Sequence, residues 1–84
     1  MRKINLSIQD AFVTVIDTED HFALGDLIDY AIRRAGSNLQ ELEVVINGQE
    51  IDLLQQDRET KWNELLDENE TNDEHRTFQV KGRF

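Results

Sequence analysis

The first part of the chain shows two different patterns of apolar and polar residues. Residues 4–9 alternate with a period of two, which predicts a half-buried strand. Its core face carries Ile4, Leu6 and Ile8. Residues 11–16 are apolar and β-branched on both faces, so they predict a second strand beyond a tight turn near Gln9-Asp10. The two segments are expected to form a hairpin, but the pattern leaves open which face of the second strand is buried.

The next segment has the spacing of an amphipathic helix. Apolar residues recur every three or four positions and stop at Gly36: Leu24, Leu27, Ile28, Ala31, Ile32 and Ala35. Gly36 is expected to end the helix in the left-handed conformation. Asp29 and Arg33 are four residues apart, so we expect them to form an ion pair along the helix.

The remaining segments predict two further strands, a short helix and a closing strand. Residues 42–47 read as a strand, and Asn47-Gly48 predicts a two-residue turn into a short strand over residues 49–53. Residues 60–69 predict a short helix, in which Trp62 anchors to the core rather than serving as a binding residue. Residues 77–81 alternate again and close the sheet.

This order of elements, β-β-α-β-β-(short α)-β, predicts one α+β domain over residues 1–84. The hairpin, the helix closing at Gly36, the run Glu43-Val44-Val45-Ile46-Asn47-Gly48 and the final alternating strand resemble the ubiquitin-like β-grasp family. The resemblance implies a mixed sheet that packs on one main helix, with the first and last strands paired at its centre. These are packing and turn motifs, so they imply a fold more than a function.

The sequence departs from the ubiquitin-like pattern at two places. Conjugated members end in Gly-Gly, whereas this chain ends in Lys81-Gly82-Arg83-Phe84, so the resemblance does not imply a covalent modifier. Binding members carry an apolar patch on the open sheet face, to which Val45 corresponds, but Gln79 and Lys81 hold the outward positions of the last strand. We therefore expect this face to be polar and mildly basic.

Charge is distributed unevenly along the chain of 84 residues, whose formal net charge is −9. Residues 41–74 hold twelve of the eighteen acidic residues and only two cations, Arg58 and Lys61. An acidic field repels nucleic acid and anionic lipid, so neither is an expected direct partner. A protein with a basic surface is the favoured partner.

Residues that carry catalytic or metal chemistry show no recognisable arrangement. His21, His75, Ser7 and Ser37 are not linked by any motif spacing, and the sequence has no Gly-rich phosphate loop, so we expect no enzymatic activity and no cofactor. The acidic run over residues 67–75 lacks the turning Gly of a calcium loop and is expected to be mobile. No metal site is expected there.

Cysteine is absent from the chain, and no apolar stretch approaches the length of about 18 residues that a membrane span needs. The first residues also lack the apolar core of a secretion signal. The sequence therefore favours a cytoplasmic protein, monomeric or weakly oligomeric.

Together these patterns predict a non-enzymatic protein-interaction module whose acidic side binds a basic protein surface. A sharper version is a DNA mimic of the phage or mobile-element type, which would inhibit a nucleic-acid-binding protein. The alternative is an accessory subunit of a larger bacterial complex that docks through its sheet face at Val45, Gln79 and Lys81. The acidic residues expected to bind the partner are Glu50, Asp52, Asp57, Glu59, Glu64, Asp67, Glu68, Glu70, Asp73 and Glu74.

Overall fold

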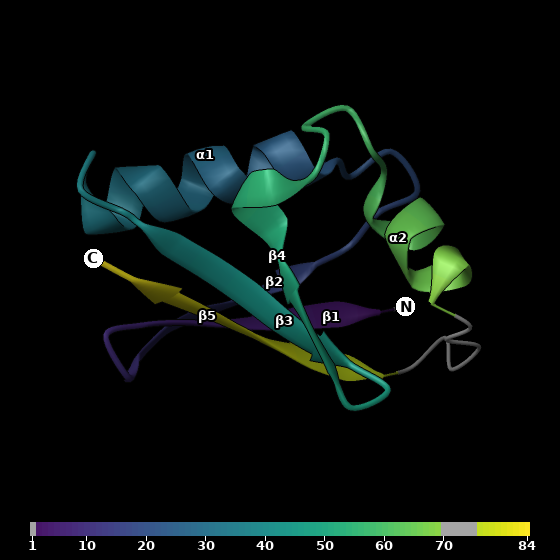
Figure 1. Cartoon of the computed structure of the whole chain (residues 1–84), viewed down its shortest axis with the longest axis horizontal. Coiled ribbons are helices and arrows are strands. Elements are labelled where there is room, and N and C mark those ends of the chain that lie inside the picture. The colour runs from purple at the N-terminus through teal and green to yellow at the C-terminus, as the bar shows by residue number, and fades with distance from the viewer. Residues whose placement is uncertain (1, 70–75) are drawn as a thin grey trace.

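The described part of the chain forms a five-stranded sheet and two helices. The computed structural model describes residues 2–69 and 76–84 (Figure 1). The strands are β1 (Lys3–Ile8), β2 (Ala11–Asp17), β3 (Glu41–Ile46), β4 (Gln49–Asp52) and β5 (Thr77–Arg83). The helices are α1 (Leu24–Ala35) and α2 (Trp62–Glu68), and a 3₁₀ turn, η1 (Leu53–Gln55), follows β4.

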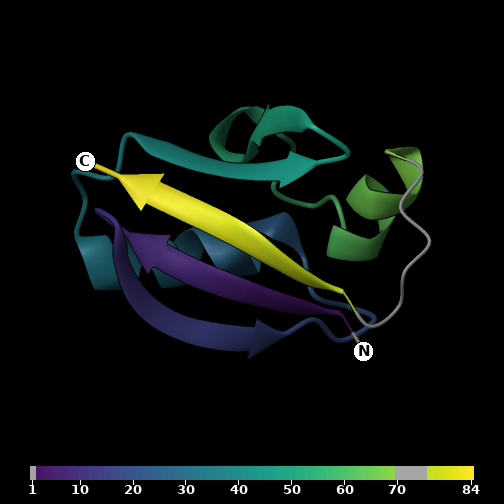
Figure 2. The ribbon, with the colours of Figure 1, turned by 90° about the horizontal axis from the view of Figure 1, so that it is seen from below.

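The sheet is mixed, and its strands lie in the order β2-β1-β5-β3-β4 (Figure 2). β1 and β5 are parallel neighbours at the centre, and the other three pairs are antiparallel. The predicted α+β class and the predicted order of elements are therefore confirmed. The parallel pair places the first and last strands side by side in the middle of the sheet, with the two ends of the described chain at opposite ends of this pair (Figure 1).

Both hairpins turn through residues with positive φ, as two-residue turns between twisted strands require. Gln9 and Asp10 have φ of 52° and 63°, and Asn47 and Gly48 have φ of 52° and 80°. The turns predicted at Gln9-Asp10 and Asn47-Gly48 are confirmed.

A β-bulge in β2 explains why its burial pattern was ambiguous. Leu6 lies opposite Thr14, but the next residue of β1, Ser7, lies opposite Phe12, so β2 has an extra residue at Val13. Val13 and Ile16 are half-buried against the core, whereas Phe12 is 65% exposed and Val15 is 47% exposed. Neither face of β2 is fully buried.

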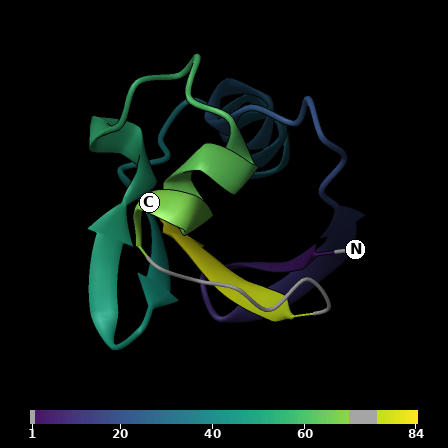
Figure 3. The ribbon, with the colours of Figure 1, turned by 90° about the vertical axis from the view of Figure 1, so that its right-hand side faces the viewer.

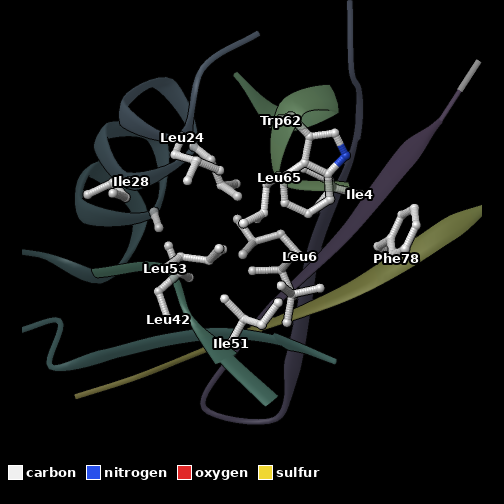
Figure 4. Close-up of a cluster of buried hydrophobic side chains, with 14 of the residues drawn as sticks. Ile4, Leu6, Leu24, Ile28, Leu42, Ile51, Leu53, Trp62, Leu65 and Phe78 are labelled. Carbon is white, nitrogen blue, oxygen red and sulfur yellow. The ribbon is translucent and has the colours of Figure 1, made fainter. Parts of the chain in front are cut away.

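The core lies between one face of the sheet and the two helices. α1 crosses this face, and α2 covers one end of it (Figures 1 and 3). The side chains that fill the space include Leu6, Leu24, Leu53 and Leu65 (Figure 4). Trp62 is fully buried, and its ring meets Phe78 edge to face with centroids 5.7 Å apart. The core interpretation of Trp62 is therefore confirmed.

Two local predictions need correction. β4 ends at Asp52 and not at residue 53, because the Asp52 carboxylate accepts a hydrogen bond from the Leu54 N–H and starts η1, which buries Leu53. Gly36 has the expected positive φ, 85°, but its ψ of 175° is extended and not left-handed helical. This region of backbone space is essentially restricted to glycine.

Candidate interaction surfaces

The acidic segment, which we define as residues 50–74, spans three elements. Glu50 and Asp52 lie on β4, Asp57 and Glu59 lie on the connection after η1, and α2 carries three further carboxylates, Glu64, Asp67 and Glu68. All seven residues are exposed. The other predicted site residues of this segment, Glu70, Asp73 and Glu74, lie outside the described residues.

Two of these carboxylates stabilise the local backbone. Asp52 caps η1, and Asp57 Oδ1 accepts a hydrogen bond from the Glu59 N–H at 2.9 Å. Such side-chain bonds to the backbone two residues on are typical of Asp in turns. Within the described residues, the carboxylates of Glu50, Glu59 and Glu64 make no hydrogen bond or ion pair, and the same holds for Asp67 and Glu68.

A hydrogen bond joins the β3–β4 turn, just before the acidic segment, to the end of the segment's described part. Asn47 Nδ2, in the β3–β4 turn, donates to the Asn69 carbonyl oxygen at 2.6 Å. Asn69 in turn donates from its side chain to the Leu65 carbonyl oxygen at 2.8 Å and closes α2. The carboxylates of β4 and α2 therefore belong to elements tied together at the same end of the molecule (Figure 3).

The two cations of the acidic segment are directed toward α1 and the chain before it. Arg58 Nη2 donates to Asp29 Oδ1 at 2.6 Å, so the predicted Asp29–Arg33 ion pair is wrong. Asp29 pairs with Arg58 because the connection after η1 passes over the start of α1. It places the Arg58 guanidinium closer to the Asp29 carboxylate than Arg33 is. Lys61 Nζ donates to the His21 carbonyl oxygen at 3.3 Å. Neither cation therefore pairs with the carboxylates of α2.

Figure 2 shows the open face of the sheet, with α1 behind it. This face is mixed in charge. Residues directly opposite each other on paired strands share a face. Lys3 and Asp17 are such a pair, as are Glu43 and Asp52. Among the described strand residues, this rule places Asp17, Glu41, Glu43, Glu50 and Asp52 on the open face, against Lys3, Lys81 and Arg83.

The expectation of a mildly basic open face is therefore wrong. The sequence estimate omitted the contributions of β2 and β4, whose register was not known. The two predicted surfaces also meet, because Glu50 of the acidic segment is the cross-strand partner of Val45.

Exposed apolar residues stand at two places on this face. Val45 on β3 is 50% exposed, and Gln79 and Lys81 on the neighbouring β5 are exposed beside it. Phe12 and Val15 lie on the same face at the other edge of the sheet, on β2. They were missed as candidate binding residues, although the run of apolar residues on both faces of this strand was visible in the sequence.

An open groove of about 640 Å³ runs along the start of α1. Its lining includes Asp26, Asp29, Arg58, Glu59 and Lys61. The first N–H groups of the helix are already satisfied, because Leu24 and Gly25 donate to the carbonyl oxygens of Thr60 and Arg58, and the Asp26 carboxylate accepts the Ala23 N–H. The groove therefore offers no free backbone cradle for an anion.

The residues considered for catalysis do not converge in the described part of the chain. His21 is exposed and lies 3.5 Å from Glu19 Oε2, Ser7 lies on β1, and Ser37 follows α1. His75 is outside the described residues. The described residues contain no group of three or more His, Cys, Asp or Glu side chains that could hold a metal ion. Neither described helix has the length and apolar character needed to cross a membrane.

Comparison with known proteins finds no family model that matches the chain and no curated protein that matches it.

Proposed function

We propose that this chain is a non-enzymatic protein-interaction module whose acidic segment binds a basic surface of a partner protein. The observation that carries the proposal is a set of exposed carboxylates on α2 and on the connection before it. They form no ion pair within the described residues. Clustered like charges repel one another in the free protein, and a cationic partner relieves that repulsion. The partner is a protein, and neither nucleic acid nor membrane binds directly.

A DNA mimic is the sharper form of this proposal. Duplex DNA carries one charge per about 1.7 Å of its axis, and a nucleic-acid-binding groove is built to accept that density. Glu64, Asp67 and Glu68 have the i, i+3, i+4 spacing that places side chains on one side of a helix. A protein of the phage or mobile-element type would use such a surface to inhibit the owner of the groove.

The fold we infer is the ubiquitin-like β-grasp fold, in a single domain. Two observations support it: β1 and β5 are parallel neighbours at the centre of the sheet, and α1 packs across one face. The family resemblance implies the same arrangement. We also infer a cytoplasmic protein that is monomeric or weakly oligomeric.

The alternative function is that of an accessory subunit of a larger bacterial complex, docked through the open sheet face. The observation that favours it is the 50% exposure of Val45, beside Gln79 and Lys81. The two surfaces meet at Glu50, which lies opposite Val45, but the carboxylates of α2 and of the connection before it can be tested separately, because these elements lie at the end of the core.

Affinity capture from the native host with two variants distinguishes these functions. The first variant removes four carboxylates by the changes Glu59→Gln, Glu64→Gln, Asp67→Asn and Glu68→Gln. It keeps Asp52 and Asp57, whose side chains accept hydrogen bonds from backbone N–H groups. The second, Val45→Lys, alters the open sheet face. We expect the first variant, and high salt with the parent, to lose the partner, while the second retains it.

The opposite pattern, loss with Val45→Lys and retention with the neutralised variant, would establish the alternative. A partner retained by both variants would reject both surfaces. For the DNA mimic, the captured protein should release duplex DNA when the parent chain is added, and the neutralised variant should release much less.

A further inference from the structure

The outer edge of β2 is a free strand edge. β2 is the last strand of the sheet on its side, and no described segment pairs with its outer edge (Figure 2). A row of unpaired backbone N–H and C=O groups is a template for another strand. This edge is therefore a place where a second chain can add by backbone hydrogen bonding.

The pairing with β1 indicates which backbone groups are free. Thr18 N–H donates to the Arg2 carbonyl oxygen at 3.0 Å. In an antiparallel ladder, hydrogen-bonded and non-hydrogen-bonded pairs alternate, so Ile16 and Thr14 also face β1. The N–H and C=O groups of Val15 and Asp17 then point away from β1, and the Val15 carbonyl oxygen accepts only a long hydrogen bond of 3.5 Å from the Thr14 hydroxyl.

The two edges of the sheet are protected to different degrees. β4 has four residues, of which Glu50 and Asp52 are charged, and it ends where Asp52 caps η1. β2 has seven residues, contains no Lys, Arg or Pro, and has Asp17 as its one charged residue. Its bulge lies opposite Leu6 and Ser7 and leaves Thr14–Asp17 regular. Short, charged edges discourage strand addition, so β2 is the receptive one.

Apolar side chains lie on both sides of this edge. Phe12 and Val15 are exposed on the open face, and Val13 and Ile16 are only half-buried on the core side. An added strand directs alternate side chains to the two faces. Its apolar residues would therefore cover apolar surface on either side of β2.

Charge around the edge defines the chemistry of the added strand. No Lys or Arg occurs between residues 4 and 32. The exposed charged residues on β2 and beside its two ends are acidic: Asp10, Asp17, Glu19 and Asp20. Lys3 lies opposite Asp17 on β1, on the side away from the free edge. Lysine or arginine at the ends of an added strand would face these carboxylates.

We propose that an extended segment of the partner protein, with alternating apolar residues flanked by lysine or arginine, adds to β2 as a sixth strand. This inference rests on the proposed function, since it describes how a basic partner binds. It adds a contact at β2 to the contact that the acidic segment makes.

Amide NMR with designed peptides tests this inference. The probe is the peptide KKVTVTVKK, and two controls change one property each: KKVTPTVKK keeps the charge but cannot form the ladder, and EEVTVTVEE reverses the charge. We expect the first peptide to shift the amides of Val15 and Asp17 and to slow their hydrogen exchange. Each control peptide should bind with an affinity at least about tenfold lower.

Matched protein variants provide the second arm. Val15→Lys and Val45→Lys make the same change at similar exposures, 47% and 50%, on the same face. We expect Val15→Lys to abolish peptide binding and Val45→Lys to retain it. Equal binding of KKVTVTVKK and KKVTPTVKK would overturn strand addition.

Further outcomes separate this inference from the proposed function. Shifts confined to residues 57–68 would overturn strand addition and leave the acidic surface standing. No shift with either cationic peptide at millimolar concentration would count against both. Shifts of Val15 that grow with protein concentration in the absence of peptide would show that the occupant is a second copy, which also overturns the proposal.

Discussion

The apolar residues of α1 differ sharply in burial. Leu27 is fully buried, whereas Ile32 is 38% exposed. Leu27→Ala should lower the free energy of unfolding by about 2–5 kcal/mol, because it removes a buried side chain and leaves a cavity. Ile32→Ala is the matched control on the same helix and should cost less than about 1 kcal/mol. Denaturant unfolding of both variants measures the difference, and equal losses would contradict the observed orientation of α1.

Gly25 shows how close contact with another segment can require a glycine inside a helix. Its N–H donates to the Arg58 carbonyl oxygen, and an added Cβ would lie 3.0 Å from that oxygen. Alanine usually stabilises a helix by up to about 1 kcal/mol relative to glycine. Here the contact with backbone outweighs that gain, so we expect Gly25→Ala to lose about 1 kcal/mol, or about 4–8 °C in Tm. A Tm above that of the parent would show that the connection yields at Arg58.

At the scale of elements, the sequence predicts what depends on local patterns. The strands, α1 and both positive-φ turns follow from alternation, helical spacing and turn residues, and the structure confirms them. The β2 bulge, η1 and the later start of α2 at Trp62 do not, because each depends on contacts between distant segments. Lys61 bridges to Ala23, and the Trp62 N–H donates to the Phe22 carbonyl oxygen, so tertiary pairing holds this approach to the helix extended.

The end of α1 gives a prediction about one backbone conformation. Gly36 has φ of 85° and ψ of 175°, and nothing lies within 4 Å of an added Cβ. Gly36→Val should therefore be destabilising through backbone strain alone, by about 1–3 kcal/mol. D-alanine at the same position is the control, because these angles mirror the extended conformation of an L residue. A synthetic chain with D-alanine should melt at or above the parent's Tm, and a large loss there would show that space, not backbone strain, restricts the site.

At the scale of the whole molecule, composition predicts the acidity of the candidate surface but not its layout. The twelve acids of residues 41–74 are visible in the sequence. Their grouping depends on tertiary structure: Asn47 ties β4 to the end of α2, register brings Glu50 beside Val45, and Arg58 is drawn to Asp29. Register and long-range pairing are global properties, so single-residue patterns do not reveal them.

Self-repulsion across the molecule should make its stability depend on salt. The net charge is −9 and the longest dimension is 33 Å, while the Debye length is about 30 Å at 0.01 M salt and about 8 Å at 0.15 M. At low salt the carboxylates therefore interact across the whole fold, and at 0.15 M mainly with near neighbours. Removing charge from Glu59, Glu64, Asp67 and Glu68 leaves every described backbone hydrogen bond in place, so the neutralised variant should keep the fold.

We expect the neutralised variant to melt above the parent at 0.01 M NaCl, with the difference in Tm shrinking as salt is raised to 0.15 M. Thermal unfolding of both proteins at several salt concentrations measures this difference. Lys81→Gln is a useful control, because it makes the net charge more negative and should lower Tm most at low salt. A difference in Tm that does not change with salt would contradict long-range repulsion. It would assign the effect to local contacts of the four carboxylates. These carboxylates would then be engaged within the molecule and not available to attract a basic partner.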